Sequence, residues 1–257
     1  YVRGEHDGTV LTTGSTARIL ELGSGVTSNT VLDQLIFRSG RAERGGALLV
    51  QVGAAVTVRT CRFVNNNAQH PTGASFGGAI VLELGSGASL DSCSFANNFA
   101  GSGDLETCYG GAVYAASAAR LHVERCVFYR NVAAGFEGGA GGAIAADDDV
   151  GLEIREGAFT GNLAGYGGAV LALGGLIERC RFDGNGGTYG GAAIEMHAYL
   201  SSIDIRGNVF VRNDAIGAPT LVVLGPGELR NNTIAFNGLN YSTGGLVFGG
   251  GLQVRRN

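Results

Sequence analysis

The chain has 257 residues and a formal net charge of −4, from 18 basic and 22 acidic side chains. Its 46 glycines lack a Gly-X-Y period, which excludes collagen, and its 45% apolar content excludes a disordered chain. The negative charge and the absence of a basic run argue against a nucleic-acid partner, and no apolar run approaches the roughly 20 residues that span a bilayer.

Residues 1–14 precede the first recognisable repeat, and we expect them to form an N-terminal edge or an incomplete coil. The chain begins at Tyr1, and this stretch has no apolar segment typical of a signal peptide. We interpret this start as that of a processed chain. It favours an extracellular or cell-surface location.

Two short motifs alternate along the chain from residue 15 onward. The segment LELGSG occurs at 20–25 and again at 82–87. Gly-Gly-Ala begins at Gly45, Gly77, Gly110, Gly141, Gly167 and Gly190, with degenerate copies at Gly244-Gly245-Leu246 and near Gly217-Ala218. Phe is followed three residues later by Asn in Phe63/Asn66, Phe95/Asn98, Phe128/Asn131, Phe159/Asn162, Phe182/Asn185 and Phe210/Asn213, with Ile234/Asn237 as a variant. The anchors from Phe37 to Ile234 lie 23 to 33 residues apart, so the chain is a repeat protein.

Stacking the repeats on the Phe reveals further columns. The residue five positions before it is always aliphatic, as in Val58 and Leu90, and the residue two before it is often Cys. These two apolar columns are three residues apart, an odd number that would place them on opposite faces of one straight strand. A bend must therefore separate two short strands. The Asn column suits left-handed turn residues whose amides hydrogen-bond from coil to coil.

These columns predict an all-β fold, a right-handed parallel β-helix of about 8–9 coils in one domain spanning residues 1–257. Regular coils are expected over 15–243, and an incomplete C-terminal coil over 244–257.

The alternation of "GGAI" or "GGAV" with "FANN" and "FYRN" resembles the passenger repeats of the polymorphic membrane protein family of autotransporters. It is similar more broadly to pectate-lyase-like right-handed parallel β-helix proteins. The autotransporter resemblance covers roughly residues 15–250 and implies a surface-exposed, adhesive β-helix. No membrane-barrel segment follows, and no catalytic signature carries over.

Insertions gather at one corner of the predicted coil. The distance from Gly-Gly-Ala to the next Phe is 18 residues in four consecutive coils, whereas the return distance varies from 8 to 15. The longest loops, 66–76, 98–109 and 131–140, are consecutive and predict a surface patch, either for binding or as neutral variation. Aromatic residues precede several glycine pairs, as a platform for sugar rings or as a shield for the turns: Phe76, Tyr109, Tyr166 and Tyr189.

Four of the five cysteines fall in the inward column. Cys61, Cys93, Cys126 and Cys180 are therefore predicted to form a ladder of buried thiols, because side chains in register on parallel strands rarely reach disulfide geometry. Cys108 lies in a loop, where it is either free or paired between molecules. No C-x-x-C spacing suggests zinc.

The candidates for chemistry are few. Asp147 and Asp149 belong to an acidic triplet that either binds calcium or forms a solvated turn, and no other cofactor is expected. Glu195 and His197 share one strand face, with Arg179 or Arg206 as possible neighbours, and are the only catalytic candidates.

Three functions follow from these observations. The first is a secreted, non-enzymatic adhesive or structural module that binds a cell-surface glycan or protein. The second is a subunit of an extracellular filament, joined head to tail to copies of itself through open coil ends. The third is a polysaccharide-active lyase or hydrolase that uses Glu195 and His197.

Overall fold

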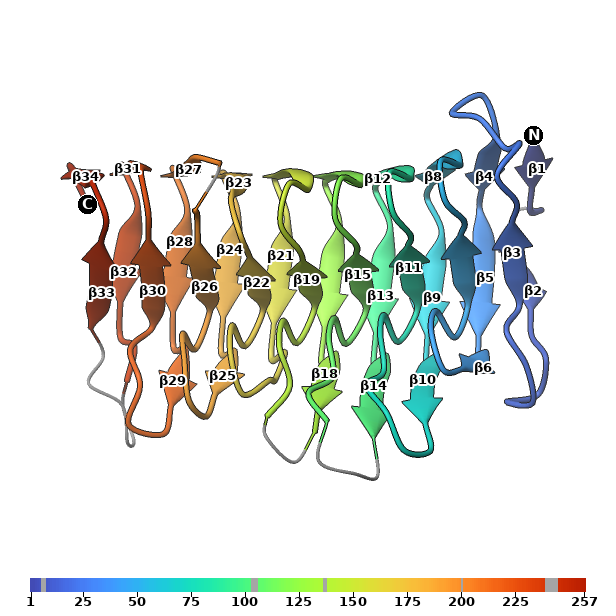
Figure 1. Cartoon of the computed structure of the whole chain (residues 1–257), viewed down its shortest axis with the longest axis horizontal. Coiled ribbons are helices and arrows are strands. Elements are labelled where there is room, and N and C mark those ends of the chain that lie inside the picture. The colour runs from blue at the N-terminus through green and yellow to red at the C-terminus, as the bar shows by residue number, and fades with distance from the viewer. Residues whose placement is uncertain (6–7, 103–105, 136–137, 200, 239–244) are drawn as a thin grey trace.

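The computed structural model of the chain describes residues 1–5, 8–102, 106–135, 138–199, 201–238 and 245–257, which form a solenoid of short strands (Figure 1). Its sheets run along the rod, and each coil adds one strand to each of three sheets. The predicted right-handed parallel β-helix is confirmed, with about nine turns in the described residues. No helix in this part of the chain has the length and apolar character needed to cross a membrane.

Sheet C contains the strands that follow the glycine pairs. Its nine strands within the described residues are β3 (Leu20–Leu22), β7 (Leu48–Val50), β11 (Ile80–Leu82), β15 (Val113–Ala115), β19 (Ile144–Ala146), β22 (Val170–Ala172), β26 (Ile194–His197), β30 (Leu221–Leu224) and β33 (Leu246–Gly249).

Sheet A contains the aliphatic column. Its ten strands in the described ranges are β1 (Val2–Arg3), β4 (Val31–Asp33), β8 (Ala55–Arg59), β12 (Gly87–Asp91), β16 (Arg120–Glu124), β20 (Gly151–Arg155), β23 (Gly175–Glu178), β27 (Ile203–Arg206), β31 (Gly227–Arg230) and β34 (Leu252–Arg255).

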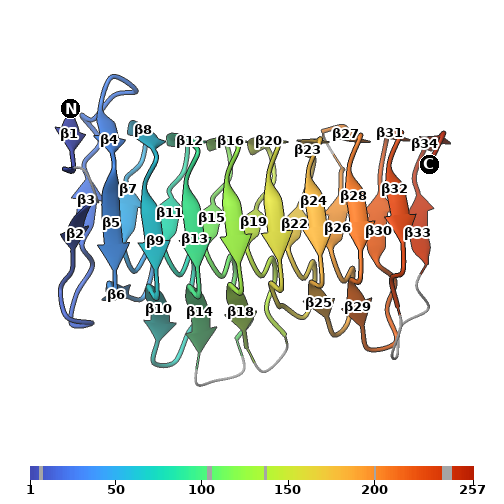
Figure 2. The same cartoon turned by 180° about the vertical axis from the view of Figure 1, so that it is seen from behind.

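Sheet B contains the Phe column and is seen in strand order in Figure 2. Across the described chain its nine strands are β2 (Thr9–Leu11), β5 (Leu35–Arg38), β9 (Arg62–Val64), β13 (Ser94–Ala96), β17 (Val127–Tyr129), β21 (Ala158–Thr160), β24 (Arg181–Asp183), β28 (Val209–Val211) and β32 (Thr233–Ala235).

Short strands after the Asn corner form a fourth layer. Sheet D comprises β6 (Arg41–Ala42), β10 (Asn67–His70), β14 (Phe99–Ser102) and β18 (Val132–Ala134), and β25 (Gly186–Gly187) pairs separately with β29 (Asp214–Ala215). Residues 1–14 contribute β1 and β2 to sheets A and B. Of the final degenerate repeat, Gly244 lies outside the described residues.

The predicted bend between sheets A and B is confirmed. A single residue with positive φ turns the chain there, for example Thr60 at 54°, Ser92 at 53° and Arg125 at 52°. A second such residue turns the chain from sheet B toward sheet D, for example Asn65 at 55° and Asn97 at 54°. Each single left-handed residue makes a sharp corner without a loop.

The phenylalanines fill the rod as one continuous stack. Neighbouring rings lie 4.7–4.9 Å apart between centroids, within 11° of parallel. The centroid spacing equals the distance between neighbouring strands, so each ring repeats the position of the one below it. The predicted ladder is confirmed over Phe37, Phe63, Phe95, Phe128, Phe159, Phe182 and Phe210, all fully buried.

The predicted asparagine ladder is also confirmed. Asn66 Nδ2 donates to Asn98 Oδ1 at 3.0 Å and to Phe37 O at 3.0 Å. The same bonds recur along the column through Asn98, Asn131, Asn162, Asn185, Asn213 and Asn237. The left-handed conformation expected at each Asn is found one residue earlier, since the positive φ belongs to the residue before each Asn. The Asn itself instead points inward, where its amide satisfies buried backbone groups.

The cysteine ladder is confirmed as buried free thiols at Cys61, Cys93, Cys126 and Cys180. Burial raises the pKa of Cys61 and of Cys180 to about 12, so both stay protonated. Cys108 is also free, and it is fully buried against Ala68 and Ala100. Its burial leaves the sulfur no access to another molecule, so pairing between molecules is not supported.

Farther along the rod the cysteine column becomes a second asparagine ladder. The backbone N–H of Cys180 donates to Asn208 Oδ1 at 2.8 Å, and Asn208 Nδ2 donates to Asn232 Oδ1 at 3.0 Å. Asn257 continues the series, accepting from Asn232 Nδ2 at 2.9 Å. Sulfur in the first part of the column and amide oxygen in the last part therefore have the same structural role, accepting backbone hydrogen bonds at the inner corner between sheets A and B.

One glycine pair is displaced from its predicted register. Val170 pairs with Ile194, which aligns Gly191, rather than Gly190, with Gly167. Gly190 is an additional residue, and a Cβ there would lie 1.7 Å from Glu195 Oε2. The coil accepts the extra residue because it is glycine.

Candidate functional site

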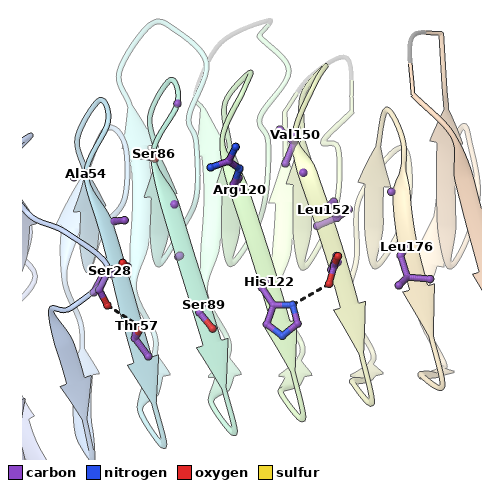
Figure 3. A pocket seen from close by; sticks show the side chains of 18 of the residues that line it. Ser28, Ala54, Thr57, Ser86, Ser89, Arg120, His122, Val150, Leu152 and Leu176 are labelled. Carbon is purple, nitrogen blue, oxygen red and sulfur yellow. Dashed lines mark hydrogen bonds and ion pairs between the residues drawn. The ribbon is translucent and has the colours of Figure 1, made fainter.

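A trough of about 930 Å³ lies over the outer face of sheet A (Figure 3). Side chains alternate across a strand, so the floor consists of the outward residues of successive coils. These residues are small in β8 and β12, which lowers the floor. The lining includes Ser28, Ala55, Thr57, Gly87, Ser89, Arg120, His122, Gly151, Glu153, Leu176, Ser201, Ser202 and Asp204.

Hydroxyl groups dominate the end of the trough nearer the N-terminus. Thr57 and Ser89 are neighbours in register on β8 and β12. Thr57 Oγ1 donates to the carbonyl of Ser28, which lies in the loop between β3 and β4 (Figure 3). This loop stands out beyond the other turns of the rod (Figure 1). Together these groups offer hydrogen bonds to a polar ligand without a fixed charge.

Charged side chains line the other half, and most are already paired. His122 Nδ1 lies 3.3 Å from Glu153 Oε2 (dashed line in Figure 3). Arg155 Nη1 lies 3.1 Å from the same oxygen. Asp204 is paired with Arg206 at 2.5 Å. Arg120 is exposed and has no partner within the described part of the chain. The trough thus holds no cluster of free charges of one sign.

A row of ion pairs borders the trough along sheet A. Glu178 contacts Arg155 at 3.3 Å, Arg179 at 2.9 Å and Arg206 at 3.1 Å. The hydrogen bond from Arg206 is the main cause that holds the pKa of Glu178 below its ordinary value. Farther along, Arg125 pairs with Asp91 at 2.7 Å. These charges neutralise each other across coils.

The aromatic residues before the glycine pairs lie over sheet C. The rings of Phe76 and Tyr109 stack 5.5 Å apart and within 6° of parallel. They pack on Tyr114 and on the apolar outward residues Leu49 and Val81. Because the two rings face each other along the rod, their edges point outward and their faces are partly covered.

The aromatic column breaks up after Tyr109. The next coil has Ala140 at the position, and Tyr166 follows it. Tyr189 lies one residue before the column because of the extra Gly190, 5.6 Å from the Tyr166 ring and tilted by 39°. Tyr189 is 57% exposed. A sugar-stacking role for these rings stays a prediction.

One residue of the acidic triplet, Asp147, contacts this aromatic cluster. Tyr114 Oη donates to Asp147 Oδ2 at 2.5 Å, and burial raises the pKa of both groups. Asp149 turns the chain with a φ of 57° and is exposed. Within the described residues no three His, Cys, Asp or Glu side chains converge on one point. Calcium binding by Asp147 and Asp149 stays a prediction.

Glu195 and His197 do share the outer face of β26, as predicted. His197 Nε2 lies 2.9 Å from Glu195 Oε1, and the Gly191 N–H donates to Glu195 Oε2 at 3.1 Å. Glu195 is 7% exposed. The predicted arginine neighbours are wrong, since Arg206 lies on sheet A and Arg179 at the corner after it, and both pair with Glu178. The pair does not line the trough, which lies on another sheet.

The three long loops lie side by side, as predicted. Their first residues form β10, β14 and β18, which pair in sequence order along sheet D at the lower edge of Figure 1. Residues 103–105 and 136–137 of the second and third loops lie outside the described residues. The trough was missed from sequence, although its signal was available in the small residues of the outward column, such as Ala55, Gly87 and Ser89.

Comparison with known proteins identifies one family. A family model described as a right handed beta helix region matches residues 7–144, which is more than half of the chain. Neither a curated protein nor a solved structure matched the chain. From β20 onward, the strands other than β25 and β29 continue the same three sheets beyond the matched segment.

Proposed function

This chain belongs to the right-handed β-helix family, and on that premise we propose that it is a secreted or surface-exposed adhesive module that binds a hydroxyl-rich glycan without cleaving it. The observation that carries the proposal is the trough on sheet A, with Thr57 and Ser89 on its floor. Glycan-binding sites need several polar groups along an extended surface, and the trough spans the coils from β8 to β27. The resemblance to autotransporter passenger repeats supports an adhesive role.

The charged groups of the trough support binding rather than cleavage. A glycosidase needs two carboxyl groups that are free to act on opposite sides of the bond. Here Glu153 is engaged by His122 and Arg155, and Asp204 is engaged by Arg206. Neither carboxylate is poised as a free acid or base.

A pair of matched substitutions tests the trough. Ser89 on β12 and Ser94 on β13 both point outward from the same coil, but only Ser89 lines the trough. A neutral glycan is selected by array screening, and its affinity is then measured by calorimetry. We expect Ser89→Phe to weaken binding at least tenfold and Ser94→Phe to leave it unchanged. Equal affinity of both variants would refute the trough as the site.

A polysaccharide-cleaving enzyme is the second candidate, favoured by the contact between His122 and Glu153 inside the trough. Incubation with glycans, with and without calcium, followed by a reducing-end assay, separates the two functions. Products that vanish in Glu153→Gln but persist in Glu195→Gln would establish an enzyme at the trough. Head-to-tail filament assembly is a separate prediction, which electron microscopy of concentrated protein tests.

A further inference from the structure

The outer face of sheet B carries an excess of arginine on a chain whose net charge is negative. The strands and the corner that follows them hold five exposed arginines and, within the described residues, one carboxylate, Asp183. We define the sheet B stripe by these arginines: Arg38, Arg62, Arg130, Arg181 and Arg212.

Most of this positive charge is uncompensated. Arg38, Arg62 and Arg130 have no carboxylate within ion-pair distance in the part of the chain that is described. Arg181 and Arg212 share Asp183, with Arg181 Nη2 at 2.8 Å from its carboxylate. Burial opposes ionisation of Asp183, but the two arginine hydrogen bonds outweigh it and lower its pKa. Even this triad retains a net positive charge.

The stripe is long and narrow. Neighbouring strands are about 4.8 Å apart, so Arg62, Arg130 and Arg181, each two strands from the next, are separated by roughly 10 Å along the rod axis. Arg62 and Arg181 begin their strands, whereas Arg130 follows the end of β17. From β5 to β28 the stripe extends about 29 Å, while a three-residue strand is only about 10 Å wide.

Small side chains point outward on two of the strands between the arginines: Ser94 and Ala96 on β13, and Ala158 and Thr160 on β21. Val127, on β17 between them, is 45% exposed. Tyr129 is 39% exposed at the centre, with the Arg130 guanidinium 5.0 Å from the centre of its ring. An aromatic ring beside a guanidinium suits a sugar ring that carries an acidic group.

We propose that the sheet B stripe binds a linear anionic polysaccharide, bearing sulfate or carboxylate groups, laid along the rod axis. Charge complementarity selects an anion, and the narrow width selects a single extended chain. A membrane would also cover the ion pairs that border sheet B, such as Asp91 with Arg125 and Glu156 with Arg179, and these offer no net positive charge to attract an anionic surface. A single exposed tyrosine is too little for the base stacking that single-stranded nucleic acid uses.

The test is a calorimetric titration with a heparin decasaccharide and with an oligogalacturonate, at low and high salt. Arg62→Ala/Arg130→Ala is the test variant. Arg125→Ala is the matched control. Arg125 and Arg130 flank the same strand, β17, but Arg125 is paired with Asp91 and Glu124. We expect at least a tenfold loss of affinity for the double variant, a weaker salt dependence, and less than a twofold change for the control. Thermal melting checks that both variants are folded.

Several results would overturn the proposal. These are wild-type affinity in Arg62→Ala/Arg130→Ala, an equal loss in Arg125→Ala, or tighter binding of anionic phospholipid vesicles or single-stranded DNA than of either oligosaccharide. Ser94→Phe should block this site and Ser89→Phe should spare it. The reverse pattern would assign the charged glycan to the trough, so the stripe would fail while the trough proposal survived.

Discussion

The inward and outward faces of sheet B differ in how regularly their residues repeat, although the two sets of residues alternate along the same strands. Inward positions are the same in coil after coil, as in Phe63, Phe95 and Phe128. The outward neighbours Arg62, Ser94 and Val127 share neither size nor charge. Rings stacked in register need identical partners above and below, whereas a solvated side chain does not. The interior therefore specifies the fold, and the exterior is free to carry binding.

The largest effect is expected from a substitution that interrupts the interior stack of phenylalanine rings. Phe128 is fully buried between Phe95 and Phe159, at 4.7 and 4.8 Å between ring centroids. Truncation to alanine should leave a cavity in a rigid column and lower the free energy of unfolding by about 3–5 kcal/mol. Val127→Ala, on the outer face of the same strand, should change it by less than about 0.5 kcal/mol. Urea unfolding measures both, and similar losses would refute the distinction.

The second effect concerns the polar column of the interior. Asn131 Nδ2 donates to Phe95 O and Asn162 Oδ1, and its Oδ1 accepts from Asn98. Asn131→Ala leaves these buried groups unpaired, which should cost about 1–3 kcal/mol.

The control for this prediction is one coil away and points outward. Asn97 is exposed and has a φ of 54°, which glycine adopts without strain. Asn97→Gly should therefore be nearly neutral in the same urea experiment. A loss as large as that of Asn131→Ala would show that the exposed corner residue contributes as much stability as the buried amide ladder.

The interior columns could be predicted from the sequence because each one repeats a residue type. Phe95, Cys93 and Asn98 are separated by fixed short intervals, and the same intervals recur in most coils. The position of the left-handed residue could not be predicted, since Asn65 and Arg130 fill it equally well and no residue type marks it. The displaced register at Gly190 could not be predicted because Gly190-Gly191-Ala192 matches the motif in sequence. In the structure Ile194 pairs with Val170, which aligns Gly191 with Gly167.

The outer surfaces could be predicted only in part. Aromatic residues before the glycine pairs pointed to the cluster over sheet C. The trough and the stripe depend on which outward residues adjoin one another across coils 23 to 33 residues apart, and on which charges are already paired. Arg125 and Arg130 look alike in sequence, but among the described residues only Arg125 has carboxylate partners.

The smallest expected effect concerns Asp147, which lies on the outer face of the rod and yet is partly buried. Burial raises the pKa of Asp147, so the folded state binds its proton more tightly than the unfolded chain does. Its contribution is therefore favourable below about pH 4, the ordinary pKa, and is lost as the pH rises through the raised value.

Asp147→Asn should raise the Tm slightly at pH 7 and lose this advantage in acid, because its amide oxygen still accepts the Tyr114 hydroxyl. Tyr114→Phe removes that donor and should lower the Tm at pH 7. A lower Tm for Asp147→Asn at neutral pH would show that the ionised carboxylate stabilises this corner, and that the outer face of sheet C behaves like the paired charges of sheet A.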